Sequence, residues 1–179
     1  MTGGHVSSAA RDGAVIASIT EQLARRPPDA THIVVSAGGN DALQSSDILD
    51  ERLSSMGAAL ETLARVAENF RRQYARLLHR LASTGLPVAV CTIYDPRFPD
   101  GRLRRIGATA LSVLNDAITR EAFVRRFALI DLRLVCERDE DFANPIEPSA
   151  AGGAKIARAI ANFAKQVSPS ALVFASGNT

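Results

Sequence analysis

Short apolar runs alternate along this chain with longer segments in which apolar residues recur every three or four positions. The runs are rich in β-branched residues, which is typical of buried strands, and they occupy residues 32–36, 88–93 and 127–131. The helical spacing predicts amphipathic helices at about 14–26, 53–83, 107–126 and 150–167. Because strands that alternate with helices pair in parallel through right-handed crossovers, we expect an α/β fold, a three-layer α/β/α sandwich.

The carboxyl ends of the strands are the places where this fold is expected to bind a ligand. Three polar loops follow strands directly or close behind: the Gly39-Asn40 turn, the Tyr94–Gly101 loop and the Asn144–Ser149 loop. They are therefore predicted to share one edge of the sheet.

Composition and charge are those of a globular protein with one domain, residues 1–179. The 179 residues are 46% hydrophobic and 22% charged, with a formal net charge of +2, and this length suffices for a full hydrophobic core. The arginines are spread along helical faces, whereas a nucleic-acid-binding surface needs a concentrated basic patch, so we expect no nucleic-acid partner. Cys91 and Cys136 lie in apolar stretches and are expected to be core residues, without metal-ligand spacing or a disulfide framework.

Targeting and membrane signals are not visible in the sequence. No basic-plus-apolar leader is present, and no apolar run approaches the ~18 residues of a membrane span. We therefore expect a cytoplasmic protein without a membrane span; the pattern specifies no oligomeric state.

The most informative stretch is the turn that follows the first predicted strand. The apolar run ends in Gly38, Gly39, Asn40 and Asp41, so the backbone can approach a ligand closely with an amide side chain beside it. A backbone N–H and an Asn amide at the end of a parallel strand are the two donors that an acyl-transfer site offers to a developing oxyanion. The alternative is a strand-to-helix turn in which Asn40 and Asp41 cap the next helix.

This turn resembles the third sequence block, Gly-x-Asn-Asp, of the SGNH (GDSL-type) esterase/lipase superfamily. Residues 11–16 resemble the second block of that superfamily, in which a glycine N–H, here that of Gly13, is a further oxyanion donor. The resemblance covers about residues 6–165 and leaves 166–179 as a tail. It implies a flavodoxin-like parallel sheet.

Residues 141–157 resemble the final block of the superfamily, where Asp-x-x-His precedes a Pro, a small polar residue, a Gly and a helix. Alignment on Pro148 and Ser149 places Glu147 at the position of the family's His and Asn144 at that of its Asp. A carboxylate can act as a base, but a Glu needs partial burial to raise its pKa toward neutrality. Asn144 could orient Glu147 through an amide hydrogen bond. The alternative is that Ser149 caps the last helix and Glu147 is a solvated anion near its N-terminus.

The resemblance implies hydrolysis of a carboxylic ester, with a small-molecule ester as substrate and no cofactor. The N–H groups of Gly13 and Gly39 and the Asn40 amide would hold the oxyanion. Glu147, oriented by Asn144, would act as the base.

One part of the family pattern is missing from the chain. An SGNH enzyme begins with a strand that leads into Gly-Asp-Ser, whose serine is the nucleophile, and this tripeptide does not occur here. Ser7 and Ser8 are expected to belong to the second strand, and Ser36 lies just before the oxyanion turn. Because the first strand is central in the flavodoxin-like order 2-1-3-4-5, its absence would leave unpaired strand edges and an apolar slot.

Three explanations of the missing strand remain open. An upstream segment could supply both the strand and the Gly-Asp-Ser, which is the explanation we favour. Alternatively, the apolar tail segment 171–175 could enter the vacant slot, or the chain could be a degenerate fragment that is unstable alone.

Two other functions compete with ester hydrolysis. The chain could be a non-catalytic binding module of the SGNH fold, in which arginines in and after the Tyr94–Gly101 loop bind an anion; these are Arg97, Arg102, Arg104 and Arg105. A flavodoxin-like nucleotide binder is the third possibility, and the chain lacks both a Gly-x-x-x-x-Gly-Lys loop and a Gly-x-Gly-x-x-Gly turn.

Overall fold

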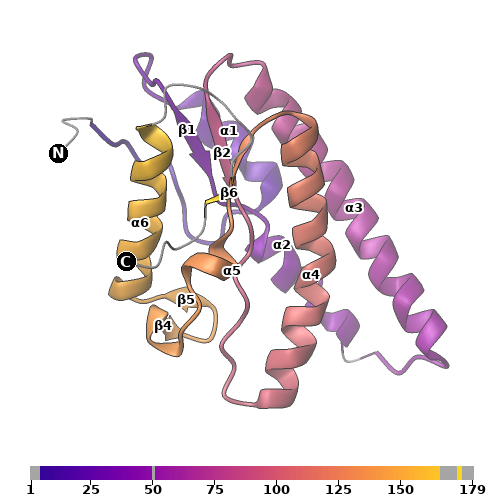
Figure 1. Cartoon of the computed structure of the whole chain (residues 1–179). Coiled ribbons are helices and arrows are strands. Elements are labelled where there is room, and N and C mark those ends of the chain that lie inside the picture. The colour runs from indigo at the N-terminus through magenta and orange to yellow at the C-terminus, as the bar shows by residue number, and fades with distance from the viewer. Residues whose placement is uncertain (1–4, 50, 166–172, 175–179) are drawn as a thin grey trace.

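A parallel sheet with helices on both faces forms the centre of the computed structural model, which describes residues 5–49, 51–165 and 173–174 (Figure 1). The strand order is β1-β2-β3-β6, and all neighbours are parallel. The strands are β1 (Ile33–Val35), β2 (Val88–Cys91), β3 (Ala128–Ile130) and β6 (Val173–Phe174). The predicted three-layer sandwich is confirmed.

One face of the sheet is covered by two long helices and two short helical elements. These elements are η1 (Ile16–Ser18), α1 (Ile19–Ala24), α3 (Met56–Ala82) and α4 (Gly101–Val124). Val35, Val90 and Leu129 point into this layer and pack against the fully buried Leu78 and Ile118 of α3 and α4. Burial of these side chains fixes the register of the strands, because a one-residue slip would turn them to the opposite face.

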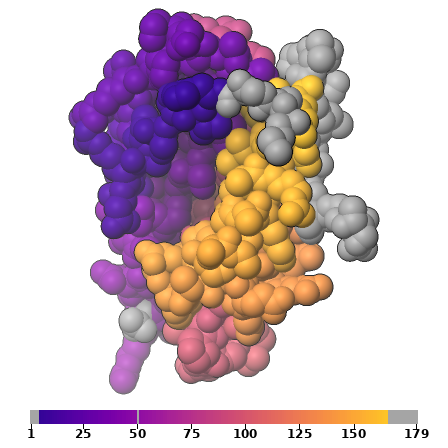
Figure 2. Space-filling model, turned by 90° about the vertical axis from the view of Figure 1, so that its left-hand side faces the viewer, coloured from indigo at the N-terminus to yellow at the C-terminus, as the bar shows by residue number. Residues whose placement is uncertain are grey.

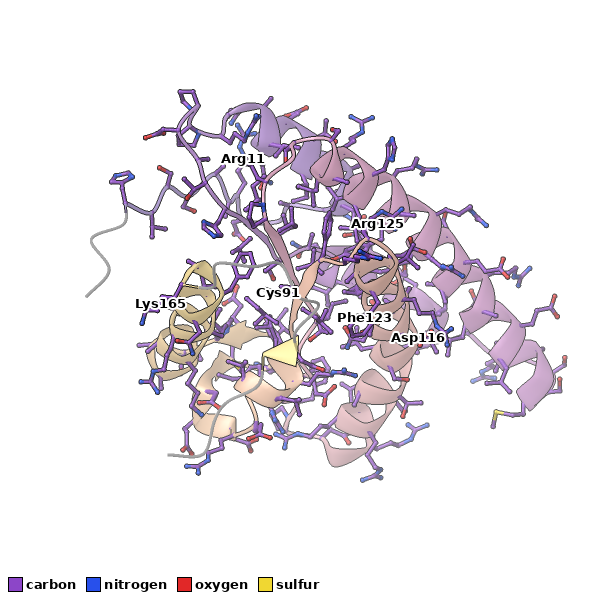
Figure 3. All side chains as sticks on the ribbon, turned by 45° about the horizontal axis from the view of Figure 1, so that its top comes forward. Arg11, Cys91, Asp116, Phe123, Arg125 and Lys165 are labelled. Atoms are coloured by element: carbon purple, nitrogen blue, oxygen red, sulfur yellow. The ribbon has the colours of Figure 1, made fainter. Side chains whose placement is uncertain are left out.

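The other face is covered by α5 (Leu132–Val135) and α6 (Ala150–Ala164). Cys91 and Ile130 face this layer and pack with Phe163 of α6. Figure 3 shows Cys91 in the middle of the sheet, with α6 on one side and α4 on the other. Between α5 and α6 the chain forms η3 (Asp139–Asp141) and a small hairpin of β4 (Phe142–Asn144) and β5 (Glu147–Pro148).

Several predicted boundaries move for local reasons. Helix α4 begins at Gly101 and not at 107, because the Asp100 side chain accepts hydrogen bonds from the backbone N–H groups of Arg102 and Leu103 and so caps the helix. Two short elements that the periodicity did not predict, α2 (Gly39–Gln44) and η2 (Ser46–Leu49), follow β1.

The N-terminal segment differs from the prediction. Residues 5–15 form no strand, so the expected second strand with Ser7 and Ser8 is wrong; residues 5–12 are all exposed. A strand needs a neighbour to pair with, and in the described part of the chain no strand pairs with the outer edge of β1. Figure 2 shows this side of the molecule hollowed between the indigo N-terminal segment and the yellow helix α6.

The tail does not fill the vacant slot beside β1. In the predicted tail segment 171–175, residues 173–174 are described, and they pair with β3 at the opposite end of the sheet. The strands β1, β2 and β3 match the last three positions of the order 2-1-3-4-5, and no described strand occupies the first two.

Candidate active site

A cavity of about 540 Å³ lies at the carboxyl ends of β1 and β2. Its lining includes Gly39 and Asn40 from the turn after β1, Tyr94 from the loop after β2, and Glu147 from the hairpin before α6. These residues belong to the three loops that were predicted to share one edge of the sheet. That prediction is confirmed.

The walls of the cavity away from these polar groups are largely apolar. They come from α2 and η2, from α3, from the loop after β2 and from α4: Leu43, Ile48, Leu49, Leu63, Val66, Pro96, Phe98, Leu103, Leu111 and Leu114. A polar edge beside a deep apolar wall suits a ligand with a polar centre and an apolar chain.

The turn after β1 depends on Gly38. Its φ of +115° lies in a region that side-chain-bearing residues rarely adopt, and a Cβ there would lie 2.8 Å from Cζ of the buried Phe70. The glycine therefore lets the chain reverse closely over α3 and start α2 at Gly39, which brings the backbone of Gly39 to the cavity.

The turn leads from β1 into α2, as the alternative predicted, but Asn40 and Asp41 do not cap this helix, so the capping part of the alternative is wrong. The Asn40 amide donates a hydrogen bond of 2.8 Å to the carbonyl oxygen of Ala14, and the Asp41 carboxylate accepts one of 3.1 Å from the N–H of Ile16. Burial raises the pKa of Asp41, and the Ile16 N–H opposes this effect. The two side chains thus join the regions that resemble the third and second family blocks.

The bond to Ala14 leaves Asn40 with donor capacity. A primary amide carries two N–H groups, and the Ala14 carbonyl accepts one of them. Asn40 also lines the cavity, so the Ala14 carbonyl orients its side chain while one donor stays available to a ligand.

Gly13 is placed differently from the other predicted donors. Its neighbours Asp12 and Ala14 line the cavity, but Gly13 does not. Its N–H donates a hydrogen bond of 2.9 Å to the Asp12 side chain, so in this structure that donor is already engaged.

Glu147 and Asn144 form the predicted orienting contact, since the Asn144 amide donates a hydrogen bond of 2.5 Å to the Glu147 carboxylate. Both side chains are exposed, so the partial burial expected of a carboxylate base is not supplied. The Ser149 side chain caps α6 by accepting a hydrogen bond from the N–H of Gly152, as the alternative predicted. Glu147 is thus a solvated anion close to the start of α6 that also lines the cavity.

Tyr94 is a residue of the site that the sequence reasoning missed. Its hydroxyl donates a hydrogen bond of 2.5 Å to the carbonyl oxygen of Ile146, next to Glu147, and its ring packs edge-on against Phe142. Burial raises the pKa of Tyr94, with smaller contributions from Cys136 and the Glu147 charge. An aromatic residue with a polar tip, directly after a buried strand, was the available signal.

A buried hydrogen-bond network supports the floor of the cavity. The Thr92 hydroxyl, which lines the cavity, donates to the Asp131 carboxylate at 2.9 Å and accepts from the N–H of Leu132 at 2.9 Å. Burial acts to raise the pKa of Asp131, but hydrogen bonds from Arg133 and Thr92 outweigh it and hold that pKa below its usual range.

The candidate nucleophiles are serine hydroxyls and a cysteine thiol. Ser36 is exposed and lines the cavity, whereas Ser7 and Ser8 are exposed outside it. The thiol of Cys91 is buried, which raises its pKa to about 12 and makes it a poor nucleophile. Among the described residues that line the cavity, none is a histidine.

The arginines that could bind an anion are partly engaged within the protein. Arg97 donates hydrogen bonds to the carbonyl oxygens of Cys136 and Glu137, and Arg104 forms an ion pair of 3.0 Å with Asp139.

Among the described residues no group of His, Cys, Asp or Glu is suited to hold a metal ion. No helix in the described ranges is both long and apolar enough to cross a membrane.

Comparisons with known proteins identify the fold. An extracellular lipase from Streptomyces rimosus superposes with a TM-score of 0.64 at 18% identity, over 86% of this chain and 77% of the lipase. Phospholipase A1 from Streptomyces albidoflavus gives 0.62 at 17% identity, over 84% of this chain and 76% of that enzyme. LAE5, an alpha/beta hydrolase from the Lake Arreo metagenome, gives 0.59 at 17% identity, over 84% and 68%.

The chain has the fold of these hydrolases. At the level of the fold, this agrees with the resemblance seen in the sequence blocks. No family model matches the sequence, and no curated protein sequence matches it.

Proposed function

We propose that this chain is a carboxylic-ester hydrolase of the SGNH type and that the cavity binds the ester. One observation carries the proposal: Asn40 and Glu147, selected from sequence blocks a hundred residues apart, line the same cavity. The hydrolase fold and the apolar walls of the cavity also support it.

In the proposed reaction, a hydroxyl oxygen attacks the carbonyl carbon of the bound ester. The Gly39 N–H and the second N–H of Asn40 would stabilise the oxyanion of the tetrahedral intermediate. Glu147 would accept the proton of the attacking hydroxyl and return it to the departing alcohol. The attacking hydroxyl would come from Ser36, from water, or from a serine on a segment that pairs with β1.

Hydrolysis of p-nitrophenyl butyrate tests this proposal. Asn40→Ala removes one oxyanion donor and should lower kcat by about 10²–10³, whereas the matched change Asn69→Ala, at an exposed position on α3, should leave it unchanged. Glu147→Gln should lower kcat by about 10²–10⁴, with the exposed Glu137→Gln as its control. Equal rates for Asn40→Ala and Asn69→Ala would contradict the proposed site.

Ser36→Ala identifies the attacking group. If Ser36 forms an acyl-enzyme, its removal should abolish the burst of p-nitrophenol that precedes steady-state turnover. A folded Ser36→Ala protein with unchanged kinetics would exclude Ser36 as the attacking group; the absence of a burst in both proteins would then assign the attack to water.

A non-catalytic binding module is the second candidate. It is favoured by the exposure of Glu147 and by the engagement of the Gly13 N–H with Asp12. In that case calorimetry should detect binding of N-(4-nitrophenyl)butyramide, an uncleaved mimic of the ester, while the folded protein hydrolyses no ester.

A further inference from the structure

Large apolar side chains are exposed where the cavity opens. Leu43, Leu49 and Leu103 line the cavity and are also exposed to solvent. Exposed apolar residues continue from η2 into the first turns of α3. We define the apolar rim as Leu43, Leu49, Leu53, Met56, Leu60 and Leu103.

The rim extends the apolar stripe of α3 beyond the core. Met56, Leu60 and Leu63 are separated by four and three residues and lie on one helical face. Leu63 and Val66 line the cavity, and Phe70, farther along the same stripe, is buried. By contrast, Met56 is 76% and Leu60 59% exposed. Figure 2 shows the magenta start of α3 projecting from the body of the molecule.

We propose that the apolar rim docks on the surface of a neutral lipid aggregate, from which an acyl chain enters the cavity. This inference rests on the proposed ester hydrolysis. Leu49 and Leu103 at the opening, Leu63 in the wall and Leu114 deeper in the cavity give an acyl chain an apolar path that does not cross water. A lipid surface would feed the cavity through this opening, whereas a docked protein would close it.

Charge around the rim favours a surface without net charge. In the sequence, residues 43–60 contain Asp47, Asp50, Glu51 and Arg52. Arg102 and Arg105, exposed on either side of Leu103, offset the acidic excess. Acidic and basic residues are thus mixed near the rim, so it neither attracts nor repels an anionic membrane strongly, and burial of apolar side chains has to supply the affinity.

Flotation with phosphatidylcholine vesicles tests the proposal. The unmodified chain should float with the vesicles, and the double variant Met56→Ser/Leu60→Ser should partition at least about tenfold less. Phe123→Ser/Val124→Ser is the matched control, because these residues are also exposed. They lie at the last turn of α4, whereas Leu103 of the rim lies at its first turn (Figures 1 and 3). That control should bind like the unmodified chain.

Three results would overturn the proposal. They are no binding to phosphatidylcholine, equal binding by Met56→Ser/Leu60→Ser, and binding only to phosphatidylglycerol vesicles. Light scattering distinguishes lipid binding from self-association. If the unmodified chain is a dimer that does not bind vesicles, and the Met56→Ser/Leu60→Ser variant is a monomer, a second copy of the chain covers the rim. Vesicle binding without hydrolysis of p-nitrophenyl butyrate would contradict the proposed function and leave the docking surface intact.

Discussion

Two adjacent glycines of α6 should respond oppositely to alanine. A Cβ at Gly152 would lie 2.1 Å from the backbone carbonyl oxygen of Asp141, about 1.2 Å closer than an ordinary C···O contact. That oxygen also accepts a hydrogen bond of 2.8 Å from the N–H of Ser149, so α6 cannot move away without losing it. We expect Gly152→Ala to destabilise the protein by about 1–3 kcal/mol or more. At Gly153 a Cβ would meet nothing within 4 Å, so Gly153→Ala should stabilise it by about 0.4–1 kcal/mol.

Thermal unfolding followed by circular dichroism at 222 nm measures both changes. For a chain of this size, 1 kcal/mol moves Tm by about 2–4 °C, so Gly152→Ala should lower Tm by at least about 2–4 °C and Gly153→Ala should raise it by about 1–4 °C. The Gly152→Ala change should also reduce ester hydrolysis in protein that remains folded, because Asp141, the last residue of η3, directly precedes the hairpin that carries Glu147. A Gly152→Ala protein at least as stable as the parent would refute the close approach of α6 to this segment.

Three further predictions concern the sheet edge and the α3–α4 interface. Thr92→Val keeps the shape of the side chain but removes the hydroxyl that donates a hydrogen bond to Asp131. It should lower the free energy of unfolding, measured in urea, by about 1–3 kcal/mol. Gly38→Ala should lower the free energy of unfolding by about 1–2 kcal/mol, because alanine rarely adopts the positive φ of this residue, and it should also lower the rate of ester hydrolysis. Burial opposes the ionisation of Glu121, but Arg71 and Arg125 hold its pKa below the usual range. The ionised Glu121 therefore stabilises the fold at pH values above its pKa in the unfolded chain, and this stabilisation is lost as the pH falls through its pKa in the folded protein. Glu121→Gln should therefore flatten the acid limb of the urea midpoint against pH.

Local patterns were sufficient to predict the strands and long helices. The apolar runs predicted β1, β2 and β3, and helical spacing predicted α3 and α6, because burial on one face or both leaves a direct mark on the sequence. The prediction of a strand with Ser7 and Ser8 was wrong for a non-local reason. A strand forms only with a neighbour, and no described strand lies beyond β1 to pair with it.

The candidate site was predictable as a place but not as a set of bonds. Parallel topology alone brings the Gly39-Asn40 turn and Glu147 to one edge of the sheet. The Asn40 and Asp41 side chains form hydrogen bonds with Ala14 and Ile16, about 25 residues away. These bonds replace the capping of α2, which was the alternative that the local sequence offered. No local rule decides between a near and a distant partner.

The double use of Asn40 makes the size of its effect informative. Its bond to Ala14 is a neutral hydrogen bond that contributes about 0.5–1.5 kcal/mol to folding. Loss of an oxyanion donor costs about 2.7–4 kcal/mol of transition-state stabilisation. If Asn40 only held Ala14 in place, Asn40→Ala would lower Tm by a few degrees and leave the kcat of the folded protein within about tenfold of the parent. A larger loss of kcat, with Tm lowered no further, therefore requires that Asn40 contacts the reacting ester.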